Sequence, residues 1–573
     1  MDFNYLKKFL KNDFSDLPVI KIAVLADSAS QLFSMALRGY GYYAGLNLKI
    51  WEADYNQILL TVLEDGSGLY TNKPDFVIIN QSSIKLLDSF YKKDLAGKQA
   101  FSGEQLQFVE TLRQKISEKL DCSFIFINYA EINDSVFGNF ANKLDLSFLY
   151  QIRKSNVGLM DFAIRNRNVH ICDLSTIQNR FGSINTISEK LYITTENVLE
   201  IDMLPVLVKN ITDIILAGTG RFKKCLILDL DNTTWGGVIG DDGLEGIQIG
   251  DLGIGKAFTN LQKWVLQLKK RGIIIAVCSK NTEEIAMEPF KSHPDMVLKL
   301  EDIAMFVANW ENKADNIRYI QSVLNIGFDS MVFLDDNPVE REIIRQELPA
   351  VTVPELPEDP VEYLSYLTGL NLFETSSFTE ADVQRNDQYK QEAGRTALSK
   401  SITDEAGFLR SLEMTSEVKP IDNFTLPRAA QLTQRSNQFN LRTIRYSDEQ
   451  MKKVTEDDNK FSMAVSLKDK FGDYGLISLL ILEKKSTDTL FIDTWIMSCR
   501  VLKRNVEDFL LNKLILLAKE QSCNKIIGEY IATPKNGIVQ NLFYNFSFRQ
   551  TEDGLWMLET DGYTERQNFI NSY

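Results

Sequence analysis

Four clusters of polar residues follow or precede short apolar runs in the middle of the chain. Their types are those of phosphate and metal chemistry: carboxylates, a hydroxyl, ammonium groups and amides. The clusters are Asp229 with Asp231, Ser279 with Lys280 and Asn281, Lys313, and Asp335 with Asp336 and Asn337. Because ligands of a parallel sheet bind beyond the carboxyl ends of its strands, we expect these clusters to meet at one sheet edge.

These residue types predict a magnesium-dependent reaction at phosphorus. Several crowded carboxylates repel one another and need a divalent cation to stay ionised. Oxygen-only ligands favour Mg²⁺, which also binds phosphate oxygens. One carboxylate can then attack phosphorus, and a second, two residues on, can act as acid and base. The lysine and the serine would hold the phosphoryl oxygens. The alternative is that each cluster is an ordinary strand-to-helix turn with Asp or Asn as a cap.

The bulk composition narrows the classes of protein. A length of 573 residues suggests three or four domains. A formal net charge of −15 disfavours nucleic acid as a partner. No stretch approaches the roughly 20 apolar residues of a membrane span, and the first residues lack a signal-peptide core, so we expect no membrane association. Six cysteines without a CxxC pair favour a cytoplasmic location and no structural zinc.

The first third of the chain alternates short apolar runs with helical patterns. This alternation predicts a parallel sheet with helices on both faces. The expected strands are 19–27, 46–53, 75–80, 122–128 and 168–174. A further helical stretch, 193–218, would close this domain at Gly218.

A second series of alternating strands and helices begins near residue 221, and the last third has another pattern. The strands expected in the second series are 225–230, 272–278, 296–300 and 330–336. The last third has long alternating runs, 460–485 and 489–499, followed by an amphipathic helix, 504–521. Longer strands in succession predict an α+β domain with an antiparallel sheet.

The middle clusters resemble the motifs of a known enzyme superfamily. "LDLDNT", "CSKN", Lys313 and "FLDDNP" are similar to the four motifs of the haloacid dehalogenase-like (HAD) phosphatases. More narrowly, "LDLDNTTWGGVIGDDG", "HPDMVLKL", "NWENKADNI" and "FLDDNPVERE" resemble the FkbH-like proteins. The resemblance implies that Asp229 is the nucleophile and Asp231 the acid and base, and that Ser279 and Lys313 bind phosphate.

The resemblance also implies a metal site, a substrate class and a partner. Asp335 or Asp336 would complete the Mg²⁺ site with Asp229 and the backbone carbonyl of Asp231. FkbH-like proteins are implicated in moving a glyceryl group from a small phosphorylated donor to an acyl-carrier-protein thiol, with loss of phosphate. Two alternatives stay open: a plain small-molecule phosphatase with flanking specificity domains, and a binding scaffold built from degenerate enzyme folds.

The segment after the second aspartate would be a short flap in place of a large cap. Its glycines suit a β-hairpin over 235–243. An open site of this kind fits a bulky carrier partner. Family members usually carry leucine where this chain has Thr234, and we interpret Thr234 as a flap-packing position.

Cys278 directly precedes the phosphate-binding serine and has two interpretations. It is a buried cysteine at a strand end, or its thiolate accepts an acyl group from an acyl phosphate. Mg²⁺, Lys280 and Lys313 would lower its pKa in the second case. Strand alternation would aim Cys278 and Ser279 to opposite faces, which disfavours that case.

The start of the chain resembles the opening of SGNH-type hydrolases. "VIKIAVLADSASQLF" places Asp27 and Ser28 after the first strand, where that family has its nucleophilic serine. The family's triad needs a histidine three residues after an aspartate, but Arg167 stands three residues before His170. We therefore predict a non-catalytic SGNH-like domain in which Ser28 caps a helix. Asn128 would line its cleft.

The last third resembles the GNAT-like acyltransferase domain of the same family. The resemblance implies that the loop 500–505, with Arg500 and Arg504, binds the pyrophosphate of acyl-CoA at a helix N-terminus. Lys503 and Asn505 replace the usual glycines of that loop and would obstruct close backbone approach, so acyl-CoA binding is in doubt.

Together these patterns divide the chain into five segments. They are an SGNH hydrolase-like α/β domain (1–185), a helical linker (186–220), a HAD-like catalytic domain with a parallel sheet (221–370), a connector (371–400) and a GNAT-like α+β domain (401–573).

Overall fold

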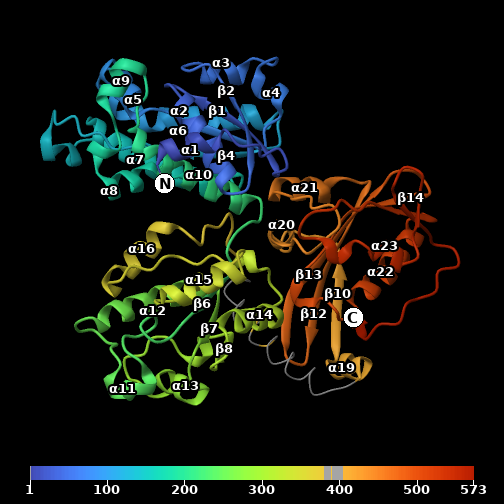
Figure 1. Ribbon diagram of the computed structural model, residues 1–573. Helices are drawn as coiled ribbons and strands as arrows, with labels where there is room; N and C mark the ends of the chain where they lie inside the picture. Colours follow the sequence, from blue (N-terminus) through green and yellow to red (C-terminus); the bar gives the residue numbers. More distant parts are fainter. Residues whose placement is uncertain (1, 380–388, 390, 392–403, 573) are drawn as a thin grey trace. The chain divides into compact units, whose positions relative to one another are not determined.

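The computed structural model describes residues 2–379, 389, 391 and 404–572. The chain divides between Ala217 and Gly218 into two compact units, each described by itself (Figure 1). Most of the predicted connector 371–400, and the first residues of the predicted C-terminal domain, lie outside the described residues.

The first unit is built on a five-stranded parallel sheet of order β2-β1-β3-β4-β5. All five predicted strands are confirmed. They are β1 (Val19–Ala26), β2 (Asn47–Glu52), β3 (Phe76–Asn80), β4 (Ser123–Ile127) and β5 (Val169–Cys172). This is the flavodoxin-type order, in which the direction of winding reverses beside β1.

Helices cover both faces of this sheet. Successive residues of β1 alternate between two cores: Ile22 and Val24 face one, Ala23 and Leu25 the other. The helices are α1 (Phe3–Phe9), α2 (Gln31–Tyr43), α3 (Ile58–Leu63), α4 (Gly68–Asn72), α5 (Ser83–Tyr91), α6 (Leu95–Ser117), α7 (Phe148–Arg165), α8 (Leu174–Phe181), α9 (Glu189–Thr195) and α10 (Leu204–Gly218). The predicted two-sided α/β domain is thereby confirmed.

The prediction of a helical linker over 186–220 is wrong. Helix α10 packs into the same core as Ile22 and Val24, and its Leu207, Val208 and Ile211 are fully buried there. A linker would leave this apolar stripe in water. The segment is therefore an integral layer of the first unit.

The second unit begins with a four-stranded parallel sheet of order β8-β7-β6-β9. The strands are β6 (Cys225–Leu228), β7 (Ile274–Ser279), β8 (Met305–Ala308) and β9 (Met331–Leu334). Three of the four predicted strands are confirmed, but 296–300 is not a strand. Gln262 accepts hydrogen bonds from the backbone N–H groups of Val297 and Leu298, so the edge position falls to β8.

Helices pack on both faces of this sheet as well. They are α11 (Ile239–Gly246), α12 (Gly255–Lys270), α13 (Glu283–Ser292), α14 (Lys313–Leu324), α15 (Pro338–Glu347) and α16 (Tyr363–Leu370). Leu226 and Leu228 of β6 face the core that includes α12 and α16, whereas Cys225 and Ile227 face the core that includes α14. The parallel α/β fold predicted for this region is confirmed.

The predicted β-hairpin flap over 235–243 is wrong in its secondary structure. Trp235 is fully buried in the core, and the bridges of this segment are two isolated ones, Trp235 to Asp231 and Gly236 to Gln248. The residues between Gly236 and Gln248 form the short helix α11. Gly237 and Gly243 take positive φ angles of 88° and 67°, which allow the chain to turn into and within this segment.

The last part of the second unit contains a nine-stranded sheet. Its path is β16-β17-β15-β14-β13-β12-β10-β18, with β11 paired to β14. The strands are β10 (Met414–Lys419), β11 (Phe439–Asn440), β12 (Lys460–Asp469), β13 (Gly472–Lys484), β14 (Thr489–Met497), β15 (Lys525–Gly528), β16 (Arg549–Gln550), β17 (Trp556–Glu559) and β18 (Ile570–Ser572). The helices are α19 (Glu405–Ser411), α20 (Leu426–Arg435), α21 (Asp448–Glu456), α22 (Val506–Glu520) and α23 (Leu542–Asn545).

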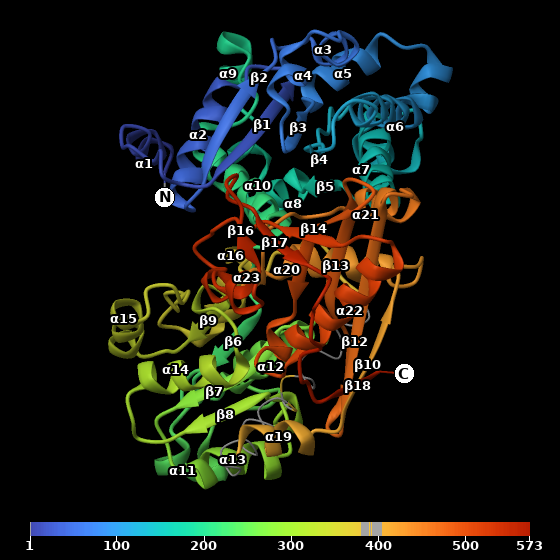
Figure 2. The same cartoon turned by 90° about the vertical axis from the view of Figure 1, so that its right-hand side faces the viewer.

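The sheet predicted to be antiparallel is a mixed one. β12, β13 and β14 pair antiparallel, as predicted, and Figure 2 shows them side by side. β14 and β15, however, pair parallel, because the chain returns between them through helix α22.

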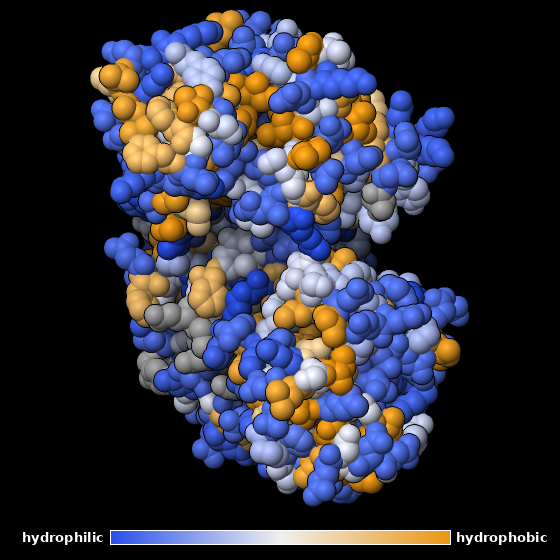
Figure 3. Space-filling view, turned by 90° about the vertical axis from the view of Figure 1, so that its left-hand side faces the viewer, coloured by the Kyte–Doolittle hydropathy of each residue, from blue (hydrophilic) through white to orange (hydrophobic). Residues whose placement is uncertain are grey.

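No helix in the described ranges combines the length and apolar character that a bilayer crossing needs. On the face drawn in Figure 3, hydrophilic residues surround scattered groups of hydrophobic ones. Scattered apolar residues of this kind are normal on a protein surface.

Asp27, directly after β1, carries a buried carboxyl group. Ser82 donates its backbone N–H to both carboxyl oxygens, at 2.9 and 3.0 Å. Burial nevertheless raises the pKa of Asp27 to about 6. An unfolded aspartate titrates near 3.9, so the folded chain binds more protons between these two values. The charged form of Asp27 therefore destabilises the folded state. This destabilisation is absent at about pH 4 and complete above about pH 6.

We expect Asp27→Asn to stabilise the first unit at pH 8, by on the order of 2 kcal/mol, and to have little effect near pH 4. Calorimetry of the whole chain at both pH values, following the transition of this unit, measures the difference. Asp161→Asn, on an exposed position of α7, is the matched control. A difference between Asp27→Asn and wild type that does not change with pH would contradict the argument.

Candidate active site

The predicted clusters meet at the carboxyl ends of β6, β7 and β9. Asp229 follows β6, and its backbone N–H donates to Leu334 of β9 at 2.9 Å. Asp335 follows β9, and Ser279 is the last residue of β7. Burial raises the pKa of Asp229, and the side chain of Ser279 acts to lower it. All three catalytic candidates are buried because they continue strands that are buried on both faces.

Lys313 forms ion pairs with the aspartates that follow β6 and β9. Its ammonium lies 3.0 Å from Asp229 Oδ1 and 2.6 Å from Asp335 Oδ2, and its side chain is 4% exposed. Burial acts to lower the pKa of Lys313, but the charges of Asp229 and Asp335 hold it above its usual range. Lys313 is the first residue of α14, where the side chain of Asn312 caps the helix.

Three carboxylates lie close enough to share one metal ion. One oxygen each of Asp229, Asp335 and Asp336 lies within 4.8 Å of the others. Burial raises the pKa of Asp229 and of Asp336. Burial and the charge of Asp229 raise the pKa of Asp335 to about 6. A divalent cation would offset this repulsion, and an oxygen-only donor set fits Mg²⁺. Both Asp335 and Asp336 therefore belong to the candidate metal site.

Thr233 and Arg341, which the sequence patterns did not single out, hold the acidic pair in place together with Asn337. Thr233 Oγ1 accepts from the Asp336 backbone N–H at 2.9 Å and donates to Asp336 Oδ1 at 3.3 Å. Arg341 donates to the carbonyls of Asp335 and Asp336 at 2.9 and 2.6 Å. Asn337 caps α15 and donates its backbone N–H to Asp335 at 2.8 Å. Such supporting contacts orient metal ligands.

Asp231 points away from the other carboxylates. Its Oδ1 accepts from Trp235 Nε1 and from the Ile239 N–H, both at 3.0 Å, and its Oδ2 accepts from Asn281 Nδ2 at 3.2 Å. Its carboxylate is therefore not a member of the three-carboxylate cluster. The backbone carbonyl of Asp231 as a metal ligand stays a prediction.

Thr234 supports the nucleophile candidate. It is 2% exposed, and its hydroxyl donates to the Asp229 carbonyl at 2.6 Å. Its own carbonyl accepts from Gln262 Nε2 at 2.8 Å. The interpretation of Thr234 as a flap-packing residue is thus replaced. Its hydroxyl forms a hydrogen bond that holds the backbone of Asp229 in place.

The hypothesis of a reactive Cys278 is wrong. Its side chain is fully buried and packs in the core with Ala314 and Ile317. Burial raises its pKa, so the thiolate is disfavoured. Cys278 and Ser279 face opposite sides of β7, as strand alternation requires. Lys280, expected to assist, pairs with Glu340 at 2.6 Å instead.

The two arginines predicted to bind CoA are used inside the protein. Arg504 is 5% exposed and lies 3.4 Å from Asp469, and it donates to the hydroxyl of Tyr474. Arg500 is 7% exposed and donates to Ser498 Oγ at 3.1 Å and to the Tyr474 carbonyl at 3.4 Å. Their assignment as cofactor-binding residues is therefore corrected to a structural one.

Lys503 and Asn505 lie in the same loop as these arginines. They take φ angles of 61° and 57°, the left-handed conformation that glycine favours. The loop therefore keeps a glycine-like backbone while carrying side chains. Acyl-CoA binding there stays a prediction in doubt.

The serine and asparagine candidates of the first unit lie near helix starts. Ser28 is 3% exposed, but the prediction that it caps a helix is wrong, because the N-cap residue of α2 is Ser30. Asn128 donates to Asp173 at 2.8 Å and accepts from the Ser175 N–H at 3.0 Å, both at the start of α8. His170 lies within β5, opposite Ile125, and so does not follow a strand end. The non-catalytic SGNH-like assignment stays a prediction.

The fold and the site together define a class of protein. A two-sided parallel sheet carries two aspartates, a serine, a lysine and an acidic pair at one edge, the arrangement of the HAD-like phosphatases that the motifs resemble.

Comparison with known proteins gives the family. Residues 21–216 match the model of the FkbH N-terminal domain. The crystal structure of the N-terminal part of BF1531 from Bacteroides fragilis, which contains a phosphatase domain complexed with Mg, is 50% identical. The match has a TM-score of 0.64 and covers 66% of this chain and 100% of that one. The chain belongs to the same family as BF1531.

The last third matches other structures at a much lower level. The GNAT domain of S. lividans PAT is 17% identical, with a TM-score of 0.20, over 25% of this chain and 88% of that one. The Escherichia coli ribosomal-protein-S18-alanine N-acetyltransferase is 14% identical, with a TM-score of 0.21, over 27% of this chain and 100% of that one. Similarities of this size do not establish the fold or the function of this region, and the GNAT-like assignment stays a prediction. No curated protein sequence matches the chain.

We expect Arg504→Met to destabilise the second unit by about 3–5 kcal/mol, because it removes the guanidinium that pairs with the buried side chain of Asp469. Chemical denaturation of the whole chain measures the loss. Lys503→Met, one residue away and exposed, is the matched control and should leave stability unchanged. Unchanged stability in Arg504→Met would restore a ligand-binding role for this arginine.

Proposed function

We propose that the chain is a Mg²⁺-dependent phosphatase of the HAD type that acts on a small phosphorylated substrate. The observation that carries the proposal is the buried Lys313 between Asp229 and Asp335, beside a three-carboxylate cluster. The 50% identity to a protein whose phosphatase domain was crystallised with Mg supports it.

In the first step, an Asp229 carboxylate oxygen forms a bond to phosphorus as the bond from phosphorus to the leaving oxygen breaks. Asp231 gives its proton to that leaving oxygen. Trp235 and Ile239 hold one oxygen of Asp231, and Asn281 orients the other. Ser279 and Lys313 stabilise the charge on the phosphoryl oxygens. Bound Mg²⁺ would neutralise the carboxylates and polarise the phosphoryl group.

In the second step, water attacks the phosphorus of the aspartyl phosphate. Asp231 takes the proton from the water, the bond between Asp229 and phosphorus breaks, and inorganic phosphate leaves. The Thr234 hydroxyl holds the Asp229 backbone at 2.6 Å throughout, so the carboxylate returns to its starting position.

A finer form of the proposal is transfer of a glyceryl-type acyl group to an acyl-carrier-protein thiol. The thiol sulfur would bond to the acyl carbon, the bond from that carbon to the phosphate oxygen would break, and the thiol proton would leave with phosphate. The FkbH N-terminal domain supports this form. So does the short flap, since α11 spans only eight residues and leaves room for a bulky acceptor. The plain phosphatase is the alternative.

We expect Asp229→Asn to reduce Mg²⁺-dependent phosphate release by at least about a thousand-fold, because it removes the nucleophile. Release from a panel of small phosphoesters and acyl phosphates measures the activity, with and without added carrier proteins. Asp241→Asn, exposed on α11, is the matched control. Absence of release by the wild type from every substrate would favour the binding scaffold instead.

Chelation should abolish phosphate release, and Mg²⁺ should restore it. We expect Thr233→Val to raise the Mg²⁺ concentration needed for half-maximal activity by about 10–100-fold, because Asp336 loses its supporting hydroxyl. Thr368→Val is the matched control, since Thr368 is exposed on α16 and its hydroxyl donates to the carbonyl of Leu364 in its own helix. Equal Mg²⁺ requirements in the two variants would count against Asp336 as a ligand.

A further inference from the structure

A cavity lies in the second unit, at the edge of the phosphatase-like sheet opposite the candidate active site. Its lining includes Lys224, just before β6, and Ser330, just before β9. The catalytic candidates Asp229 and Asp335 follow the same two strands. Because the strands are parallel, the cavity is separated from the active site by the length of the sheet. Its volume is about 280 Å³.

The described lining of this cavity is rich in cations. The basic residues are Lys224, Arg428, Arg435, Arg500 and Lys535, and the acidic residue is Asp329. The chain as a whole carries a formal charge of −15, so the charge of the described lining is opposite in sign to the net charge of the chain. A concave site lined by one sign of charge attracts ligands of the opposite sign.

The lining is held in place by contacts between the two parts of the unit. Lys535, in the loop after β15, pairs with Asp329, in the turn before β9. Asn325 donates to the carbonyl of Cys499 at 2.6 Å, and Arg435 donates to the carbonyl of Ser377 at 2.9 Å. These contacts fix the cavity in the folded chain, so a ligand would meet a preformed site.

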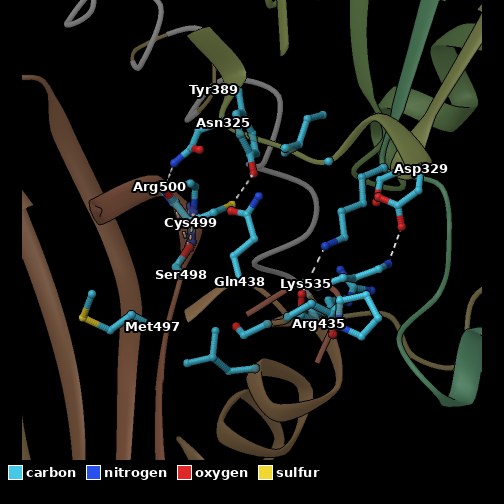
Figure 4. A pocket seen from close by; sticks show the side chains of 18 of the residues that line it. Asn325, Asp329, Tyr389, Arg435, Gln438, Met497, Ser498, Cys499, Arg500 and Lys535 are labelled. Carbon is cyan, nitrogen blue, oxygen red and sulfur yellow. Dashed lines mark hydrogen bonds and ion pairs between the residues drawn. The ribbon is translucent and has the colours of Figure 1, made fainter. Parts of the chain in front are cut away.

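The cavity also presents neutral polar groups. Figure 4 shows Gln438 pointing into it, toward Tyr389 and Cys499. The hydroxyl of Tyr389 lies 3.5 Å from the sulfur of Cys499. Gln438 Oε1 is buried and has no hydrogen-bond partner among the described residues. Since a buried carbonyl oxygen without a donor costs stability, a ligand that supplies an N–H or O–H group is favoured here.

We propose that this cavity binds a small phosphorylated compound that also carries hydroxyl or amide donors, such as a sugar phosphate, at a site separate from the phosphatase centre. The basic residues of the lining other than Arg500, which bonds within the protein, would hold the phosphate, and Gln438 would accept from a donor group. A volume of about 280 Å³ fits a ligand of that size.

Calorimetric titration of the whole chain, kept free of Mg²⁺ by EDTA, with pyrophosphate and with ribose 5-phosphate tests the proposal. We expect Lys535→Gln to weaken both probes about five- to ten-fold. Asp329→Asn removes the one carboxylate and should strengthen both several-fold. Added salt should weaken binding, because the attraction is electrostatic. Lys525→Gln, which removes one cation from the exposed Lys525–Asp488 pair, is the matched control.

Two further measurements separate this site from the proposed function. Gln438→Leu should weaken ribose 5-phosphate but not pyrophosphate, because only the sugar supplies hydroxyl donors. Phosphate release should be unchanged in Lys535→Gln and Asp329→Asn. Coenzyme A, tested as a third probe, would identify a nucleotide source if Lys535→Gln weakens it equally. Failure of every probe to bind, or equal binding by wild type, Lys535→Gln and Asp329→Asn, would overturn the proposal.

Discussion

The ion pairs of Lys313 with Asp229 and Asp335 are the interaction on which the phosphatase-like part of the chain depends. All three groups are buried, and a buried charge without a partner is strongly destabilising. The lysine can serve both carboxylates only if β6 and β9 are neighbours and α14 begins beside them. The sheet order β8-β7-β6-β9 satisfies that condition. The ion pairs therefore require this sheet order, because Asp229 and Asp335 lie 84 and 22 positions from Lys313 in the sequence.

The two neighbouring threonines, Thr233 and Thr234, each support a different aspartate of the site. Thr233 holds the carboxylate of Asp336, whereas Thr234 holds the backbone of Asp229. Two adjacent hydroxyls thereby fix the acidic residues that follow β9 and β6. Trp235, the next residue, fills the core and donates to Asp231. The tight turn after β6 thus places three consecutive side chains on three different aspartates.

The sequence predicted what depends on local pattern and missed what depends on distant partners. Continuous apolar runs such as 225–228 predicted strands correctly, because central parallel strands are buried on both faces. The run 296–300 looks the same, but the side chain of Gln262, more than thirty residues earlier, takes its N–H groups. The prediction that Arg500 and Arg504 bind a ligand is wrong because no local pattern reveals their partners inside the protein. Both arginines donate hydrogen bonds to Tyr474, and Arg504 pairs with Asp469.

The two ends of β6 and β9 carry the two proposed sites, and the packing of these strands determines whether a ligand at one end can affect the other. Hydrogen bonds from the Lys224 N–H to Ser330 at 2.7 Å and from the Asp229 N–H to Leu334 at 2.9 Å enclose the pair of strands. Each strand has four residues, so about 13 Å of sheet separates the ends. Every residue of both strands is buried, and close-packed cores resist small displacements. A ligand at the cationic end could move the aspartates only by shifting this register. We therefore expect the two proposed sites to share a scaffold and to act independently.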